Sequence, residues 1–381
     1  MSRVRALALS PVPYEGAGCR YRIAQYIPHL AAQGIDLEIA PFFDREFFEL
    51  VYQPGHTARK ALLFLRQAIG RLRTVLQHSR YDLVVIYREA LPVGPPIVEA
   101  MLAAAKVPLV YDFDDAVFLS NTSEANRWIA ALKNPHKTGA IIRRCDQVIA
   151  GNEFLAAYAR RFNPSVHVIP TSIDVDLFVP RAESRPDPTP SSAPLTVGWI
   201  GTPTTASYLI PLAPVLRGLA AEHAFEFHVA GSTAAMAFDG VPTRNLQWSL
   251  DREVELFNQC DIGVYPLPDD DWARGKCGFK AIQFMSCGVP VVASAVGVNR
   301  EIVQDGVNGF LASTPGEWRQ KLSALMGDGE LRRRMGAAGR RTIQARYSLQ
   351  VNGPRVAAVI GAALARTRAS DAFVHASGEP R

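Results

Sequence analysis

Short apolar segments alternate with helix-length segments along the chain, and this alternation limits the possible folds most strongly. In the first half the apolar segments are rich in β-branched residues and occupy residues 5–9, 36–40, 83–87, 108–111 and 147–150. Strands separated by helices are typical of a parallel sheet that is covered by helices on its faces. The first half therefore predicts an α/β domain.

The alternation stops at a segment rich in Pro and Ser and then begins again. The sequence RAESRPDPTPSSA fills residues 181–193, and a linker is expected there. Beyond it the expected strands are residues 195–200, 226–230, 261–266 and 289–293, with helices over 207–222 and 278–287. We predict two doubly wound, Rossmann-like domains, with boundaries at residues 1–180, 181–194 (linker), 195–365 and 366–381 (a flexible tail).

Composition excludes several classes of protein. The chain has 381 residues, of which 48% are hydrophobic and 20% charged, as expected of globular domains. Its net charge of +5 is mild, and no nucleic-acid-binding signature is present, so no nucleic acid partner is expected. No apolar run is long enough for a spanning helix, and the first residues lack a signal-peptide pattern. The five cysteines form no CxxC pair, so we expect a reducing, cytoplasmic location.

Three cations gather where the helix over residues 278–287 is expected to begin. Arg274, Lys276 and Lys280 lie in the stretch RGKCGFKAIQFMSCGVPVV, in which Gly288 and Pro290 provide ordinary helix stop signals. The N-terminus of a helix presents unpaired N–H groups and a partial positive charge, which suits a phosphate group. The alternative is a solvated basic loop before a buried helix, and the spacing alone does not decide between the two.

The stretch QFMSCGVPVVASAVGVNREIVQDGVNGFL resembles the signature of the retaining glycosyltransferases of family 4. The resemblance continues in GWIGTPTTASYL, NQCDIGVYPL and VIPTSIDVDLF, and extends over about residues 16–347. It implies the GT-B fold, in which two Rossmann-like domains face a cleft. It also implies transfer of a sugar, with retention, from a nucleotide-diphosphate sugar to a hydroxyl acceptor such as a glycan, a lipid-linked molecule or a small molecule. Neither a cofactor nor a metal ion is expected.

The resemblance also suggests roles for residues of the second domain. Lys280 and Lys276 are the expected catalytic cations, and the expected donor-binding residues are Gly201, Thr202, Arg274, Gly278, Phe279 and Gln283. The sequence departs from the family pattern at a pair of glutamates, because Gly275 and Gln283 stand at those positions. In the family the second glutamate contacts the nucleotide ribose. An amide can still form a hydrogen bond to a diol, but it carries no charge.

Glycines follow the first expected strand. Gly16 and Gly18 precede Arg20, and such glycines allow a ligand to approach the backbone closely. The resemblance implies that both glycines lie near the donor phosphate and that Arg20 lies on the acceptor side. An ordinary tight turn is the alternative for this segment.

Three carboxylates lie at the end of the strand over residues 108–111. Asp112, Asp114 and Asp115 have three interpretations: a metal-binding DxD motif, contacts to the acceptor, or an N-cap cluster for a helix that begins near Ala116. The resemblance favours the acceptor contacts without metal. Asp114 stands about where many relatives carry a histidine, which makes it a candidate catalytic residue that orients the acceptor.

A basic helix is expected over residues 59–80. Its apolar positions Leu62, Leu65, Ile69, Leu72 and Leu76 form one face, and Arg59, Arg66, Arg73 and Arg80 recur every seven residues. Two interpretations stay open. The apolar face either packs in the core or, with its arginines, contacts an anionic membrane surface as a peripheral site on the inner face of the membrane.

Two other functions are compatible with these features. A catalytically silent protein that binds nucleotide sugars would explain Gly275 and Gln283. An NAD(P)-dependent oxidoreductase would use Rossmann-like domains, but Tyr21 occupies the third glycine position of the dinucleotide-binding pattern. Glycosyl transfer is the function that the sequence favours.

Overall fold

The structure, a computed structural model, divides the chain into two compact units. It describes residues 3–51, 53, 55–119, 134–181, 194–232 and 234–376, with side chains through residue 366. Unit 1 comprises Met1–Ser172 and Asn352–Arg381, and unit 2 comprises Ile173–Val351. The predicted boundaries differ from this division in two places, because residues 173–180 belong to unit 2 and residues 352–365 belong to unit 1. Residues 182–193 of the predicted linker lie outside the described residues, as do residues 377–381 of the predicted tail.

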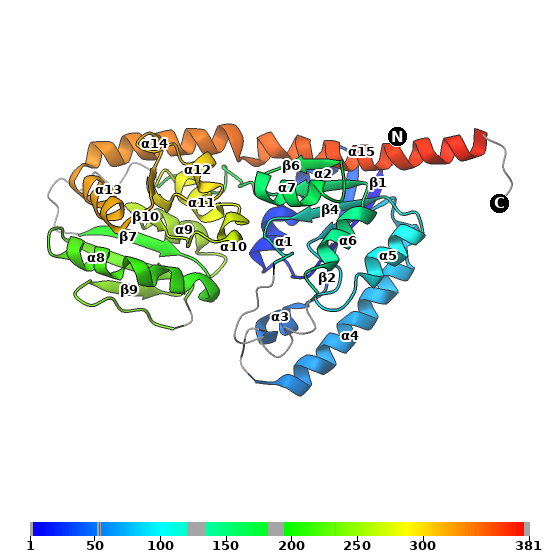
Figure 1. Ribbon diagram of the computed structural model, residues 1–381, viewed down its shortest axis with the longest axis horizontal. Helices are drawn as coiled ribbons and strands as arrows, with labels where there is room; N and C mark the ends of the chain where they lie inside the picture. Colours follow the sequence, from blue (N-terminus) through cyan, green and yellow to red (C-terminus); the bar gives the residue numbers. More distant parts are fainter. Residues whose placement is uncertain are drawn as a thin grey trace. The chain divides into compact units, whose positions relative to one another are not determined.

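Unit 1 is built on a parallel sheet of six strands in the order β2-β1-β3-β4-β5-β6 (Figure 1). The strands are β1 Val4–Ser10, β2 Ile35–Pro41, β3 Leu83–Tyr87, β4 Leu109–Phe113, β5 Gln147–Ala150 and β6 Val166–Val168. β3 and β4 are buried at every position, as expected of central strands that are covered on both faces. Because all six strands are parallel, the loops that follow them meet at one edge of the sheet.

The helices of unit 1 connect these strands. They are α1 Ala17–Arg22, η1 Ala24–Tyr26, α2 Ile27–Ala32, α3 Arg45–Val51, α4 Thr57–Leu76, η2 His78–Arg80, α5 Ile97–Ala104, α6 Lys137–Arg144 and α7 Glu153–Arg160. Helix α15 spans Leu349–Ala376, so it begins in unit 2, continues in unit 1 and extends into the segment predicted as a flexible tail. Arg355 of α15 donates to the carbonyl oxygen of Val168 at 2.6 Å, which ties this helix to β6.

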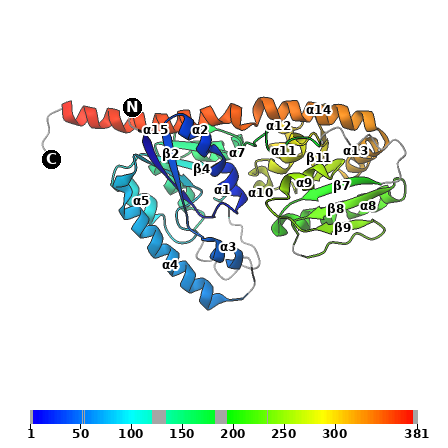
Figure 2. The same cartoon turned by 180° about the vertical axis from the view of Figure 1, so that it is seen from behind.

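Unit 2 repeats the architecture with a second parallel sheet, ordered β12-β11-β10-β7-β8-β9 (Figure 2). Its strands are β7 Leu195–Ile200, β8 Phe225–Ala230, β9 Thr243–Leu246, β10 Ile262–Tyr265, β11 Val291–Ser294 and β12 Phe310–Ala312. Its helices are η4 Pro203–Leu212, α8 Ala213–Ala220, α9 Glu253–Asn258, α10 Asp271–Arg274, α11 Phe279–Ser286, α12 Asn299–Ile302, α13 Pro315–Gly327 and α14 Gly329–Arg346. Two six-stranded parallel sheets covered by helices confirm the predicted pair of Rossmann-like domains.

Two details of unit 2 differ from the sequence prediction. Strands β9 and β12 were not expected, because both are short edge strands with several half-exposed positions. The single helix expected over residues 207–222 is wrong, since the chain forms the 3₁₀ helix η4 and then α8. Pro211 lies inside η4, and its missing N–H and its ring disfavour a continuous α-helix through this point.

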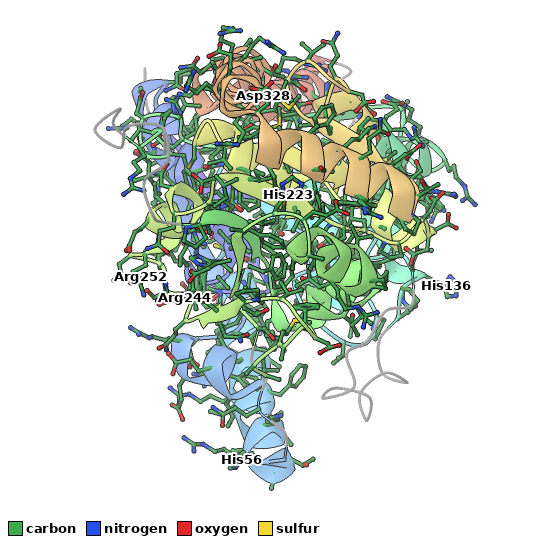
Figure 3. The ribbon with its side chains drawn as sticks, turned by 90° about the vertical axis from the view of Figure 1, so that its left-hand side faces the viewer. His56, His136, His223, Arg244, Arg252 and Asp328 are labelled. Atoms are coloured by element: carbon green, nitrogen blue, oxygen red, sulfur yellow. The ribbon has the colours of Figure 1, made fainter. Side chains whose placement is uncertain are left out.

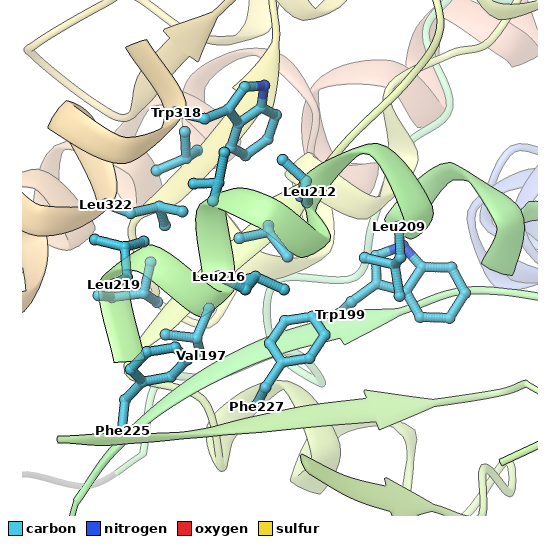
Figure 4. Packing of buried hydrophobic residues seen from close by; sticks show 14 of the residues in the cluster. Val197, Trp199, Leu209, Leu212, Leu216, Leu219, Phe225, Phe227, Trp318 and Leu322 are labelled. Carbon is cyan, nitrogen blue, oxygen red and sulfur yellow. The ribbon is translucent and has the colours of Figure 1, made fainter. Parts of the chain in front are cut away.

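The core of unit 2 lies between its sheet and the helices α8 and α13. Phe227 extends from the sheet toward Leu216 of α8, Trp199 lies beside Leu209 of η4, and Trp318 of α13 packs on the other side of α8 (Figure 4). The rings of Phe227 and Phe238 pack edge to face with centroids 5.3 Å apart. This core fixes β7 and β8, and the loops that follow both strands begin from a rigid base.

In the described part of the chain no helix is both long and apolar enough to cross a membrane.

Candidate active site

In unit 2 the predicted phosphate-binding helix is α11. Gly278 caps its N-terminus in the left-handed conformation with φ +65°, and a Cβ atom there would lie 2.3 Å from Cδ1 of Ile302. Only glycine suits this position. Gly263 of β10 faces the ring of Phe284 so closely that a Cβ would lie 2.5 Å from it, which allows α11 to pack directly on the sheet. The first-turn N–H groups, which begin at Phe279, are oriented as an anion-binding site requires.

A buried polar network joins the first turn of α11 to helix α9. Nζ of Lys280 donates to Oε1 of Gln283 at 2.8 Å, and Nε2 of Gln283 donates to Oε1 of Glu253 at 3.1 Å. Gln283 is fully buried and Glu253 is 4% exposed. Nζ of Lys280 also lies 5.4 Å from the ring centroid of Phe257, a cation–π contact. The lysine is therefore held by an amide and an aromatic ring on one side.

Glu253 is a candidate functional residue that the sequence analysis did not identify. It is the first residue of α9, and only the packing of α9 against α11 brings it to Gln283. The network contains one carboxylate, one amide and one ammonium group. A carboxylate thus lies next to position 283, although residue 283 itself is neutral. The one signal in the sequence was the glutamine itself, since an amide where an acid is typical invites a search for an acid nearby.

The other two predicted cations lie in the loop between α10 and α11. Arg274 pairs with Asp269 at 3.0 Å and with Asp271 at 3.1 Å, and its side chain is 46% exposed. Nζ of Lys276 lies 5.5 Å from the ring centroid of Trp272. Arg274 is therefore engaged by two acids at the surface.

Gly201 and Thr202 follow β7, at the same sheet edge as the loop after β10. A Cβ on Gly201 would lie 2.1 Å from the Trp199 ring, and a Cβ on Gly231 would lie 2.2 Å from the Gly201 carbonyl oxygen. Thr202 caps η4, and its backbone N–H donates to Oγ1 of Thr205 at 3.1 Å. Because β7 and β10 are parallel neighbours, the structure brings this turn and the α11 loop to one edge, as the prediction requires.

In unit 1 the predicted glycine loop precedes α1. Gly18 faces the hydroxyl of Tyr87, and a Cβ there would lie 2.2 Å from that oxygen. Gly16 is the N-cap of α1 and packs against Val12. Arg20 is 6% exposed and donates to the carbonyl oxygens of Glu15 at 3.2 Å and Tyr14 at 3.4 Å. The two glycines and the arginine therefore have clear structural roles within the loop.

Asp112 forms a buried ion pair with Arg22. Nη2 and Nε of Arg22 donate to the two carboxylate oxygens at 2.7 and 2.9 Å, and both side chains are almost fully buried. Nη1 of Arg22 donates to the carbonyl oxygen of Ile169 at 3.0 Å. Burial raises the pKa of Asp112, although Arg22 opposes that shift. The predicted acceptor-side residue Asp112 is thus bound from within the protein, which indicates a positioning role for it.

Asp114 and Asp115 share Arg88. Arg88 contacts Asp114 at 2.7 Å and Asp115 at 2.5 Å, and the hydroxyl of Tyr87 donates to Asp114 at 2.8 Å. Burial acts to raise the pKa of Asp114, but the charges of Arg88 and Arg22 together with the hydrogen bonds from Tyr87 and Arg88 outweigh burial, and the pKa lies below the ordinary value. Residues 114–119 form bends and turns, so the interpretation as a helix N-cap before Ala116 is wrong.

These contacts bear on the metal-binding interpretation of the three aspartates. Within the residues that the structure describes, no group of three or more histidine, cysteine or acidic side chains is arranged to hold a metal ion. The oxygens of Asp112, Asp114 and Asp115 accept hydrogen bonds from the guanidinium groups of Arg22 and Arg88. These contacts hold the turn at the end of β4 in place.

Comparison with known proteins identifies both halves of the chain. The family model described as Glycosyltransferase Family 4 matches residues 18–177, and the one described as Glycosyl transferases group 1 matches residues 195–328. The D-inositol 3-phosphate glycosyltransferase of Xylanimonas cellulosilytica is 27% identical over 279 residues, 63% of each chain. The enzyme of the same name from Segniliparus rotundus is 24% identical over 262 residues, 61% of this chain and 56% of its own. The chain thus spans less than two thirds of the length of these relatives.

Solved structures resemble the fold over nearly the whole chain. Sucrose-phosphate synthase from Thermosynechococcus elongatus has a TM-score of 0.67 at 16% identity, covering 96% of this chain and 100% of its own. Anabaena HepE in complex with UDP and glucose has a TM-score of 0.67 at 17% identity, covering 94% and 100%. At these identities the likeness concerns the fold, and the two family models carry the assignment. Together these findings show that the chain belongs to the group 1, family 4 glycosyltransferases, with the two Rossmann-like domains of the GT-B fold.

Proposed function

We propose that this protein transfers a glycosyl group, with retention, from a nucleotide-diphosphate sugar to a hydroxyl acceptor. The observation that carries the proposal is the Lys280–Gln283–Glu253 network at the start of α11. A cation beside the N-terminus of a helix suits the negative charge of a diphosphate. HepE was solved with UDP and glucose, and its fold resembles this chain along its length, which supports a nucleotide-sugar donor.

Unit 2 supplies the groups that bind the donor. Lys280 and the first N–H groups of α11 bind the diphosphate, and Lys276 adds a second cation. Gln283 and Glu253 hold Lys280 in place, and Thr202 at the neighbouring turn provides a hydroxyl and a backbone N–H. Such preorganised positive groups are worth most where negative charge develops on the leaving diphosphate.

The proposed reaction is attack on the same face of the sugar that the leaving group departs from. The bond between the anomeric carbon and the diphosphate oxygen breaks, and its electron pair remains on the diphosphate. A bond forms between the anomeric carbon and the acceptor oxygen, and the acceptor proton passes to the departing phosphate. The protein contributes positioning and charge stabilisation, without a covalent intermediate and without a metal ion.

The acceptor is assigned to unit 1, on the side of Arg20, Asp114 and Asp115. Asp114 is the candidate for orienting the acceptor hydroxyl, because its pKa below the ordinary value keeps it ionised at neutral pH. D-inositol 3-phosphate is the first acceptor to test, since two relatives carry it in their names. The five free, buried cysteines fit a reducing location, and we propose the cytoplasm.

Release of free nucleoside diphosphate from a panel of UDP-, GDP-, dTDP- and ADP-sugars tests the function. The panel is first ranked by the rise in melting temperature, and the best donor is then incubated with candidate acceptors in the presence of EDTA. We expect one donor to give both a thermal shift and turnover, and NMR of the product to show the anomeric configuration of the donor.

The other outcomes separate the alternatives. A thermal shift without release of nucleoside diphosphate from any donor would support a silent nucleotide-sugar-binding protein. A thermal shift with NAD(P) alone would support an oxidoreductase. Turnover that EDTA abolishes would contradict the metal-free mechanism, and a product of opposite configuration would contradict retention.

A further inference from the structure

Helix α4 has an inverted distribution of side chains. Lys60 and Arg71 are buried on its inner face, where Nη1 of Arg71 donates to the Ala40 carbonyl oxygen at 2.8 Å and Nη2 to that of Ser10 at 3.0 Å. The ammonium group of Lys60 donates to the carbonyl oxygen of Gln53 at 2.5 Å. Charged groups point inward on this helix, where backbone oxygens satisfy them. The interpretation that its five apolar residues pack in the core is therefore wrong.

Five large aliphatic side chains point outward from the same helix. Their exposed fractions are 68% for Leu62, 58% for Leu65, 44% for Ile69, 37% for Leu72 and 68% for Leu76. At 100° per residue these positions fall within an arc of about 80° and extend for about 21 Å along the helix. We call these five residues the leucine stripe. A contiguous apolar surface of this size marks an interaction site.

The helix is firmly held on its other side. Leu63 of α4 lies in a small core with Phe42, Phe47 and Leu50, and Phe64 packs against that core. In Figure 3 His56, the residue before α4, lies at the lower end of the view, so the N-terminal end of α4 projects from unit 1. The leucine stripe thus lies on a rigid, convex helix. Side chains on such a helix can insert into a deformable surface, but the helix provides no groove for a partner helix.

The charges that α4 itself carries beside the stripe are all positive. Arg66 and Arg73 follow its edge on the helix, both are exposed, and among the described residues neither has an ion-pair partner. Arg59 lies on the same flank and pairs with Glu46 at 2.5 Å. The sequence of α4, TARKALLFLRQAIGRLRTVL, contains no Asp or Glu and five cationic residues, which equals the net charge of the whole chain.

We propose that the leucine stripe and its arginine flank dock this protein on the surface of an anionic phospholipid bilayer. The aliphatic side chains enter the boundary between headgroups and acyl chains, and Arg66 and Arg73 contact lipid phosphates. An apolar stripe with a basic flank is the pattern of helices that lie in the membrane interface. The proposal goes beyond glycosyl transfer and does not depend on it.

Flotation with vesicles of phosphatidylglycerol and phosphatidylcholine tests this docking surface. The full chain is expected to float with anionic vesicles, and the variant Leu62→Ser/Leu65→Ser/Ile69→Ser should float about tenfold less. The matched control Leu177→Ser/Ile210→Ser/Leu250→Ser changes three side chains of unit 2 that are exposed to a similar degree, 60%, 62% and 40%. The control should bind like the parent protein, and circular dichroism verifies that both variants are folded.

Charge is tested separately with Arg66→Glu/Arg73→Glu. Binding to anionic vesicles should fall several-fold and become insensitive to salt, while the weak binding to pure phosphatidylcholine stays unchanged. Three results would overturn the proposal: no binding of the parent protein to anionic vesicles, equal binding of the stripe variant, or equal loss in the control. Sedimentation that shows a dimer which the stripe variant abolishes would assign the stripe to a second copy of the chain instead.

Discussion

The two sheets present the same kind of edge and use it differently. In unit 1 the charges at the carboxyl ends of β3 and β4 neutralise one another, in the pairs Arg22–Asp112, Arg88–Asp114 and Lys137–Glu89. In unit 2 a neutral amide stands between the acid Glu253 and the cation Lys280. A direct ion pair joins two opposite charges in one contact, whereas the amide relay of unit 2, the chain Lys280–Gln283–Glu253, connects them through the side chain of Gln283. Direct ion pairs therefore fix the edge of unit 1, and the proposed diphosphate site lies at the edge of unit 2.

The buried pair of unit 1 should give the largest effect. Asp112→Asn removes the carboxylate that pairs directly with the buried Arg22 guanidinium, and a stability loss of about 3–5 kcal/mol is expected. Urea unfolding measures it. The control Asp36→Asn breaks the exposed pair with Arg3, which should cost less than about 1 kcal/mol. Similar losses in the two variants would remove the distinction between buried and exposed pairs on which the comparison rests.

The cation of unit 2 should matter for turnover rather than for stability. Lys280→Ala removes the charge that we propose lies beside the leaving diphosphate, and transfer should fall by about 10²–10³-fold with the melting temperature nearly unchanged. The control is Arg274→Ala, because Asp269 and Asp271 already neutralise that cation. The assignment fails if the Arg274 variant loses as much activity as the Lys280 variant.

The amide relay itself is tested by moving its charge. Glu253→Gln should lower kcat by about tenfold, since a charge-assisted hydrogen bond becomes a neutral one. Glu255→Gln, on the same helix but exposed and paired with Arg252, should have little effect. The double variant Glu253→Gln/Gln283→Glu returns the acid to the position where the family carries it, and it should regain activity. A double variant less active than Glu253→Gln would contradict the relay.

The smallest expected effect is on the pH dependence of stability at acidic pH. The pKa of Asp114 lies below its ordinary value in the folded protein, because Arg88, Arg22 and the hydroxyl of Tyr87 together outweigh burial. Its contribution to stability is therefore complete above about pH 4, the ordinary pKa of an aspartate, and is lost as the pH falls through the lower folded value. Melting temperatures between pH 3 and pH 6 should fall more steeply for the parent protein than for Asp114→Asn. Parallel curves would show that Asp114 is not stabilised by Arg88.

The sequence predicted the fold well because central strands that are buried on both faces have continuous apolar sequences. Central strands such as β3 are continuous apolar runs, and α11 has clear start and stop signals in Gly278 and Gly288. The edge strands β9 and β12 are too short and too exposed to leave such a pattern. The split of the helix over residues 207–222 depended on Pro211, whose effect on the helix the periodicity did not reveal.

The site was predicted only in part, because partners distant in the sequence decide what a side chain can do. The acids after β4 were visible, but Arg22 lies 90 residues before Asp112, and no local pattern links the two. Glu253 likewise lies 30 residues before Gln283. The exposure of Leu65 and its neighbours could not be inferred either, since an apolar face looks the same whether it is covered or bare.

The division of α15 between the units has a consequence for the order of synthesis. Residues 1–172 leave the ribosome first, yet Gly353 packs against His29, and Val356, Val359 and Ile360 are buried residues of the same unit. Unit 2 is complete in the nascent chain before these residues appear. Unit 1 is therefore the first to begin folding and the last to finish, and a chain that ends near Val351 leaves it with an uncovered apolar surface.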